Sequence, residues 1–348
     1  MRKLLLGLVA CMLAASAGGA GLGLPPAPPP ASERLAAFEL ADRTPPLSDS
    51  RARRLESRHS SSRPYRAATG ELVHIEVSGS YSSGESIGQR WADFFAGLLH
   101  GDELQLLHAL IAPLPEVQAL CGQTALGCYG DNQLVMTGDA AGGFVPEEVA
   151  RHEYGHHIAF NRANTPWKGL EWGPKRWASY EGVCARVRAG SAYPGDEGLL
   201  YRLNPGEAFA ESYRLLSDIR SGAELRWPIL DRSFYPDPGA LRAVEEDVVA
   251  PWTGPSPAII RRSVRGNAGP IAAFRLVTSL DGTLIVRLRP AGSYDVFVVG
   301  GGDPLRATGR ASSSRETRLT YQICGDRSVA VLVTGGAGPR FEVHVTTP

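Results

Sequence analysis

The spacing of hydrophobic residues divides the chain into a mixed region and an all-β region. Residues 71–81 alternate apolar and polar side chains as a half-buried strand does, and residues 84–100 carry apolar side chains at helical spacing. Residues 104–111 are mostly apolar and fit either a strand or a short helix. Further elements are predicted as a strand over 133–136 and as helices over 146–161, 177–187, 204–217 and 236–249, with a mostly irregular stretch over 162–200.

From about residue 256 the pattern changes to short alternating runs separated by turns such as Asp281-Gly282. The runs cover residues 271–278, 283–290, 294–300, 317–323, 329–335 and 340–346. Short strands that follow one another in this way are typical of a β-sandwich. The predicted fold class is therefore α+β, with a mixed domain over 67–252 followed by an all-β sandwich domain over 256–348.

The N-terminus has the features of an export signal. Arg2 and Lys3 precede an apolar run over 4–15 that is too short to span a bilayer. Ala15-Ser16-Ala17 fits the small-x-small pattern of a cleavage site. The sequence therefore predicts a signal peptide over 1–17 and a secreted protein. No other long apolar run follows, so no transmembrane span is expected.

Two questions about this region stay open. Residues 8–11 have lipobox character, so a lipoprotein anchored at Cys11 is the alternative to a secreted chain. Residues 18–66 are rich in Pro, Ala, Ser and Arg, which is typical of a disordered linker. The same segment also fits a propeptide that is cut near Arg53-Arg54.

Charge and composition bear on which macromolecules the protein binds and on how many domains it forms. The formal net charge is 0 at pH 7, which gives no reason to expect nucleic acid or an anionic membrane as a partner. Hydrophobic residues make up 43% of 348 residues, enough for a substantial core and about two domains. The partner must therefore be inferred from the candidate site.

Without Cys11, the cysteines of the mature chain are Cys121, Cys128, Cys184 and Cys324. Four cysteines in an exported protein indicate disulfides, with three possible connectivities. Cys121 and Cys128 are close enough in sequence to close a small loop. Cys184 and Cys324 then either pair across a long separation or stay free.

The candidate chemistry centres on His152, Glu153 and His156, which form the pattern H-E-x-x-H. On a helix the two histidines lie one turn apart on one face and can bind a single metal ion. Glu153 then stands beside the metal, where a general base is needed to take a proton from water. Pro146 and the acids after it are helix-start signals. His157 points about 100° away around the helix and is expected to pack or to face solvent.

A hydrolytic zinc site needs a third protein ligand. Arg162 stands six residues after His156, where one zinc-peptidase pattern has a histidine. Glu207 and Glu211 share one face of a predicted helix, so one can bind the metal while the other holds a ligand histidine. Asn204-x-x-Glu207 is also a capping-box pattern, which gives Glu207 a structural alternative. The other candidate ligands are Glu181, Asp196 and Glu171.

The segments HEYGHHI and GEAFAESYRLL resemble those of the gluzincins, zinc peptidases of thermolysin-like fold whose third ligand is a glutamate on a following helix. Within that family they are most similar to the catalytic domain of anthrax lethal factor. The resemblance covers about residues 130–220, and the step from His156 to Glu207 is longer than in thermolysin. It implies that His152, His156 and Glu207 bind Zn²⁺, that Glu153 is the base and that Glu211 supports a ligand histidine.

The resemblance also implies a tyrosine that stabilises the transition state. Tyr201, six residues before Glu207, has the matching position, and Tyr213 and Tyr235 are the alternatives. In thermolysin-like domains the substrate is often laid as an added strand beside the sheet. By this resemblance, and because it precedes the histidine helix, the strand over 133–136 is the expected edge.

The sequence thus predicts a secreted zinc-dependent endopeptidase that acts on proteins or peptides, with possible polymer or substrate contact through the C-terminal β domain. A metalloprotease-like binding protein of the cell surface, without catalysis, is the main alternative. A surface structural protein in which the H-E-x-x-H pattern is accidental is a second alternative.

Overall fold

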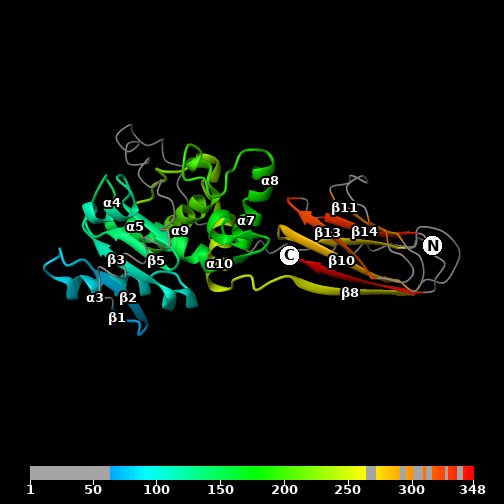
Figure 1. Cartoon of the computed structure of the whole chain (residues 1–348), viewed down its shortest axis with the longest axis horizontal. Helices are drawn as coiled ribbons and strands as arrows, with labels where there is room; N and C mark the ends of the chain where they lie inside the picture. Colours follow the sequence, from blue (N-terminus) through cyan, green and yellow to red (C-terminus); the bar gives the residue numbers. More distant parts are fainter. Residues whose placement is uncertain are drawn as a thin grey trace, which may run out of the picture.

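The computed structural model describes residues 63–263, 272–290, 295–300, 309–310, 316–325, 328–334 and 340–348. The predicted signal peptide and nearly all of the predicted linker lie outside these residues. The described chain has a mixed α/β part and a β-rich part, which follow one another along the long axis (Figure 1). The observed class is therefore mixed α+β.

The α/β part is built on a five-stranded sheet. Its strands are β1 (Arg63–Arg66), β2 (Leu72–Val77), β3 (His108–Ala112), β4 (Gly127–Gly130) and β5 (Gln133–Thr137). Their spatial order is β1-β2-β3-β5-β4. The central strands β2, β3 and β5 run parallel, and β1 and β4 lie antiparallel at the two edges. The apolar central strands suit a sheet that is covered on both faces.

The structure differs from two expectations about this sheet. The first predicted strand covers residues 71–81, but Arg63–Arg66 already forms a strand that pairs with β2, and Tyr65 within it is buried. The strand over 133–136 is the expected edge, but β5 lies between β3 and β4. The edge next to the histidine helix is therefore β4. Its short sequence, GCYG, shows no alternation that could have predicted a strand.

Different helices cover the two faces of the sheet. One face packs against the main hydrophobic core, which is shared with α3 (Gly84–Ala96), α5 (Pro146–Phe160), α9 (Pro205–Ser221) and α10 (Pro238–Val249). The other face packs against α4 (Leu114–Cys121) through a smaller cluster that includes Leu110, Val117 and Val135. The helices predicted at 84–100, 146–161, 204–217 and 236–249 are thus present, with small shifts of their ends.

The stretch over 162–200 holds several short elements. They are β6 (Ala163–Asn164), β7 (Trp167–Lys168), α6 (Gly169–Trp172), α7 (Lys175–Tyr180) and α8 (Val183–Arg188). The single helix predicted over 177–187 is therefore two helices. Gly182 separates them with a φ of 63°, a left-handed conformation that suits glycine and ends a helix.

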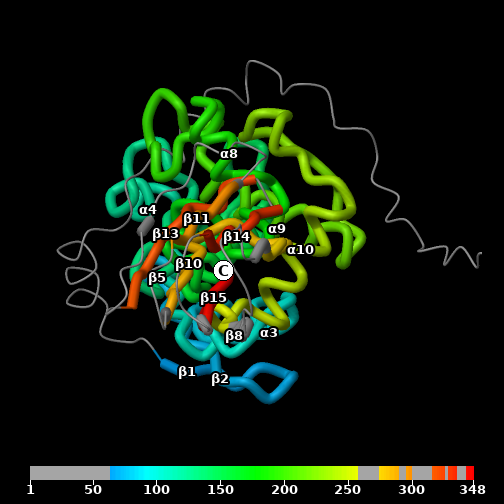
Figure 2. Tube along the Cα trace, turned by 90° about the vertical axis from the view of Figure 1, so that its right-hand side faces the viewer, coloured from blue at the N-terminus to red at the C-terminus, as the bar shows by residue number. Residues whose placement is uncertain are grey.

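The β-rich part contains two four-stranded antiparallel sheets. One is formed by β13 (Thr317–Ile323), β10 (Gly282–Pro290), β15 (Arg340–Thr347) and β8 (Ser256–Ser263), in that order. The other is formed by β12 (Gly309–Arg310), β11 (Asp295–Gly300), β14 (Ser328–Thr334) and β9 (Ala272–Val277). Residues of both sheets, such as Val286 and Val331, share one hydrophobic cluster. Figure 2 looks along the long axis, with these strands in front of the helices.

Covalent and polar contacts join the two parts. Disulfides connect Cys121 with Cys128 and Cys184 with Cys324, and the second links α8 to the end of β13. The backbone N–H of Asp281 donates to Ser179 Oγ at 2.9 Å. Of the two outcomes open for Cys184 and Cys324, pairing is the one observed. In the described part of the chain, no helix combines the length and apolar character needed to cross a bilayer.

Candidate metal centre

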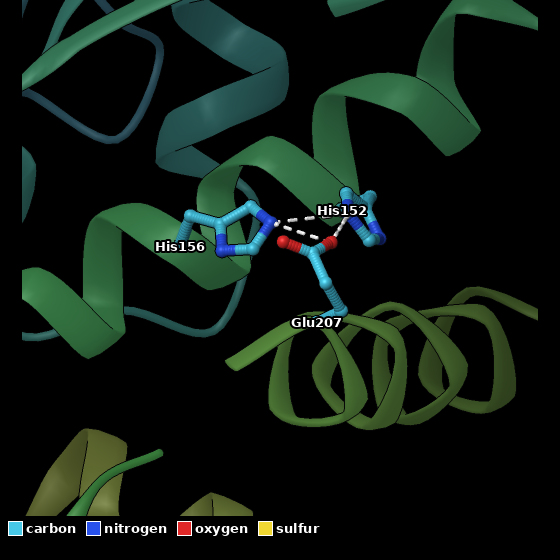
Figure 3. Close-up of side chains that lie close together, drawn as sticks. All are labelled: His152, His156 and Glu207. Atoms are coloured by element: carbon cyan, nitrogen blue, oxygen red, sulfur yellow. Dashed lines mark hydrogen bonds and ion pairs between the residues drawn. The ribbon is translucent and has the colours of Figure 1, made fainter. Parts of the chain in front are cut away.

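The histidine helix α5 is positioned by its N-terminal signals and by burial. Pro146 is its first residue, and Glu148 Oε2 accepts a hydrogen bond from the backbone N–H of Val145 at 3.0 Å. The helix is buried along almost its whole length, because it packs against the sheet on one side and α9 on the other. His152 and His156 lie one turn apart on the side toward α9 (Figure 3).

The second helix, α9, brings Glu207 to the histidines. Its N-cap Asn204 accepts a hydrogen bond from the backbone N–H of Gly206 at 3.0 Å. The Glu207 carboxylate contacts the two histidines, so the purely structural capping-box alternative is not the arrangement observed. A Cβ on Gly155 of α5 would lie 2.7 Å from Ala210 Cα of α9, so glycine at this position lets the two helices approach closely.

Three candidate ligand atoms converge between these helices (Figure 3). His152 Nε2 and His156 Nε2 lie 3.1 Å apart, and each lies 3.2 Å from Glu207 Oε2. Two ligands of a tetrahedral zinc ion, each at about 2.0–2.1 Å, lie about 3.3 Å apart. The observed separations therefore fit a three-ligand site. All three side chains are buried, and the group could hold a metal ion.

The surroundings of Glu207 keep its carboxylate ionised. Burial by itself raises the pKa of Glu207, but the imidazoles of His156 and His152 outweigh that effect and hold it well below its usual range. Glu207 is thus an ionised carboxylate that faces two imidazole nitrogens. A carboxylate and two neutral imidazoles are a donor set that zinc prefers.

Glu211 lies behind His152 at the start of a buried chain of charges. Its Oε1 lies 3.7 Å from His152 Nδ1, and its Oε2 accepts a hydrogen bond from Arg214 Nε at 2.5 Å. Arg214 Nη1 donates to Asp218 Oδ2 at 2.6 Å, and Arg151 Nη1 lies 3.1 Å from Asp218 Oδ1. Two carboxylates and two guanidinium groups balance in charge, which lowers the cost of burying them. The arrangement holds Glu211 close to the second ring nitrogen of His152.

The sequence reasoning missed Arg214, Asp218 and Arg151. A signal was available for the first two, because Arg214 follows Glu211 by three residues and precedes Asp218 by four. On a helix these spacings place the three side chains on one face. Arg151 had no such signal, because it belongs to the other helix and meets Asp218 only through tertiary packing.

Glu153 is 2% exposed and directed toward the edge strand β4. A Cβ placed on Gly127 of that strand would lie 2.7 Å from Glu153 Oε1 and 2.9 Å from Glu153 Cγ. The carboxylate of Glu153 therefore lies against β4, directly next to a residue that has no side chain. No sequence pattern predicted this contact, since it joins two segments that meet only in the folded chain.

Of the three candidate tyrosines, Tyr201 is the one placed at the ligand group. Its hydroxyl donates a hydrogen bond to Glu207 Oε2 at 2.8 Å. The Tyr213 hydroxyl donates to the backbone oxygen of Leu99 at 2.7 Å, so Tyr213 is a core residue. Tyr235 packs its ring edge-on against Trp227.

The other candidate ligands do not join the three convergent atoms. Glu181 forms an ion pair with Arg186 at 3.1 Å, and Glu171 forms one with Lys168 at 2.9 Å. Asp196 accepts hydrogen bonds from backbone N–H groups of its own loop.

His157 packs into the core on the far side of α5. Its Nε2 lies 2.8 Å from the backbone oxygen of Glu103, and its Nδ1 lies 3.0 Å from the hydroxyl of Tyr129. Burial lowers the pKa of His157 to about 4, so the ring is neutral at pH 7. Since a carbonyl oxygen only accepts, Nε2 is the donor and Nδ1 the acceptor.

Comparisons with known proteins give little further guidance. No protein-family model matches the chain, and no curated protein does. Matching solved structures include "IMPa metallopeptidase from Pseudomonas aeruginosa", at 10% identity and a TM-score of 0.19, over 91% of this chain and 54% of that chain. A second structure of IMPa, "in complex with an O-glycopeptide", matches at 9% identity and a TM-score of 0.18, over 90% of this chain and 54% of that chain.

The chain thus spans about half the length of the structures it matches. Likeness at this level carries no argument about fold or function. The functional conclusion therefore rests on the geometry of the site.

Proposed function

We propose that the protein is a secreted zinc-dependent endopeptidase of the gluzincin type, with a thermolysin-like catalytic domain over 67–252 and an accessory β-sandwich over 256–348. The observation that carries the proposal is the convergence of His152 Nε2, His156 Nε2 and Glu207 Oε2 within 3.2 Å of one another, with Glu153 next to His152 in sequence. A zinc ion held by these residues would lower the pKa of water toward about 7 and polarise a peptide carbonyl.

The chain's own residues supply the remaining functions. Glu153 acts as general base, takes the proton of the attacking water and passes it to the leaving amine. The hydroxyl of Tyr201, 2.8 Å from Glu207 Oε2, is close enough to turn its hydrogen bond to the developing oxyanion. The Glu211 carboxylate, whose Oε1 lies 3.7 Å from His152 Nδ1, would favour the tautomer with the proton on Nδ1, which leaves the lone pair of Nε2 for the metal.

The outer edge of β4 is the proposed binding site of the peptide substrate. β4 pairs only with β5 among the described strands, and its Gly127 lies against Glu153. An extended peptide that adds to this edge would place its backbone beside the base. The proposed substrates are therefore proteins or peptides in extended conformation.

Export is part of the proposal. Both disulfides are compatible with an oxidising compartment, and the predicted signal peptide gives the route out of the cell. N-terminal sequencing of the protein recovered from the medium tests this part, with a mature start near Gly18 as the expected result. Retention of a lipid on Cys11 would contradict it.

The decisive experiment replaces Glu153 by Gln. The Glu153→Gln protein should keep one zinc per chain but lose casein hydrolysis by at least about 10³-fold, because the amide cannot accept the proton. Glu147→Gln is the matched control, since Glu147 lies on the same helix but pairs with Arg90 at the surface. Substantial cleavage of denatured casein by Glu153→Gln would refute the mechanism. A wild-type chain that binds zinc but cleaves nothing would favour the non-catalytic binding protein instead.

A further inference from the structure

The edge strand β4 lies close against the histidine helix at Gly127. A Cβ there would lie 2.7 Å from Glu153 Oε1, 2.9 Å from Glu153 Cγ and 2.9 Å from Val149 Cγ1. Real Cβ atoms do not approach other heavy atoms within 3.0 Å, so a side chain at Gly127 requires neighbouring atoms to move. The φ of Gly127 is not positive, so its backbone conformation does not require glycine at this position.

The surroundings restrict which atoms can move. Val149 and Glu153 lie one turn apart on α5, so a methyl group that avoids one of them approaches the other. Both side chains are buried, and Val149 belongs to the main core. Moving the helix itself would also disturb its close contact with α9 at Gly155.

The strand is equally restrained from its own side. Gly127 pairs with Met136 of β5, which is fully buried. The next residue, Cys128, is tied by its disulfide to Cys121 at the end of α4. The side chains of Glu153 and Val149 are therefore the parts that give way, and the long Glu153 side chain can move furthest, by rotation about its own bonds.

We propose that Gly127 is a positioning residue that leaves the space in which the Glu153 carboxylate must lie to act as the general base. A side chain at this position would displace the base while the metal ligands stay in place, because His152, His156 and Glu207 are held between α5 and α9. The inference rests on the proposed function, since it gives Glu153 its catalytic role.

The test is the Gly127→Ala variant, with Gly79→Ala as its control. Gly79 lies in the same part of the chain, its φ is not positive, and a Cβ there would meet no atom within 4 Å. Gly127→Ala should keep one zinc per chain and its unfolding midpoint within a few degrees, while kcat falls about 10²-fold with little change in KM. Gly79→Ala should match the wild type in zinc content, unfolding midpoint, kcat and KM. Unchanged kcat or loss of zinc in Gly127→Ala would overturn the proposal.

A double-mutant cycle separates positioning from general damage. Glu153→Asp has a shorter side chain that leaves the crowded space, so adding Gly127→Ala to it should reduce kcat by less than about threefold. An additional loss as large as in the wild-type background would contradict action through Glu153.

Crystal structures of Gly127→Ala and wild type give a readout that does not need activity. They should show the Glu153 carboxylate displaced and the three ligand atoms unmoved. A Glu153 carboxylate that does not move in Gly127→Ala refutes the inference about Gly127. Absence of hydrolysis by the wild-type chain refutes the proposed function, but the comparison of the two crystal structures still tests whether Gly127 positions Glu153.

Discussion

Helix α5 buries one histidine on one side and two on the other, each among polar groups, but the polar atoms meet in different ways. On one side, His157 lies between a carbonyl oxygen and a tyrosine hydroxyl, so donors and acceptors alternate. Glu103 on that side accepts from Arg162 Nη2 at 2.5 Å and from the Tyr154 hydroxyl at 3.2 Å. On the other side, two imidazole nitrogens and one carboxylate oxygen face one another within 3.2 Å.

The difference shows how a buried histidine that supports the fold can be told from one whose position suits a metal ligand. Where donors and acceptors alternate, each polar atom already has a hydrogen-bond partner, so no group of lone pairs is left to bind an ion. Converging atoms that carry lone pairs repel one another unless a proton or a cation lies between them. Changes on the ligand side should therefore alter chemistry, while changes on the His157 side should alter stability.

The largest difference in kcat is expected between variants of two buried tyrosines, Tyr201 just before α9 and Tyr213 within it. Tyr201→Phe removes the hydroxyl beside Glu207 and should lower kcat by about 10²–10³-fold, the usual effect of removing one oxyanion donor. Tyr213→Phe removes a hydroxyl that donates to the backbone of Leu99 and should leave kcat within about twofold while costing about 1 kcal/mol of stability. Steady-state kinetics and urea unfolding of both variants check this. Equal kcat values for the two variants would remove Tyr201 from the mechanism.

A smaller effect, on folding stability, is expected when the pH is lowered and the buried His157 has to be protonated. The folded pKa of His157 is about 4, below the unfolded value of 6.5, so the unfolded state binds the extra proton between these values. The stability due to neutral His157 is complete above pH 6.5 and is lost as pH falls to about 4, by up to about 3 kcal/mol. Urea unfolding in the presence of a chelator, so that metal release does not contribute, should show this loss in the wild type.

His157→Gln is the control for the acid experiment, because glutamine also has a donor and an acceptor but does not titrate. Its unfolding free energy should change less than that of the wild type between pH 6.5 and 4. Parallel curves for the two proteins would mean that His157 is not the group responsible.

Local signals in the sequence predict the two site helices well. Pro146 and Asn204 mark their starts, although both helices are buried on nearly every side and not along a single apolar face. His152, His156 and Glu207 could be selected because each spacing is read within one helix. The structure brings these three residues together, and Tyr201 with them.

Features that depend on contacts between distant segments could not be predicted in the same way. The strand β4 precedes β5 in sequence but lies outside it in the sheet. The prediction that residues 133–136 form the edge of the sheet is therefore wrong. Strand order depends on pairing partners, which periodicity does not encode. The crowding at Gly127 and the ion pair of Arg151 with Asp218 likewise arise only when the elements pack.

The zinc content of His156→Ala and His157→Ala, purified side by side, tests the central claim most directly. These residues are neighbours in sequence, but His156 Nε2 is one of the three convergent atoms, whereas His157 contacts Glu103 and Tyr129. Metal analysis of the folded proteins should find no zinc in His156→Ala and one zinc per chain in His157→Ala. Full zinc retention by His156→Ala, or loss of zinc from a folded His157→Ala, would contradict the assignment of the metal centre.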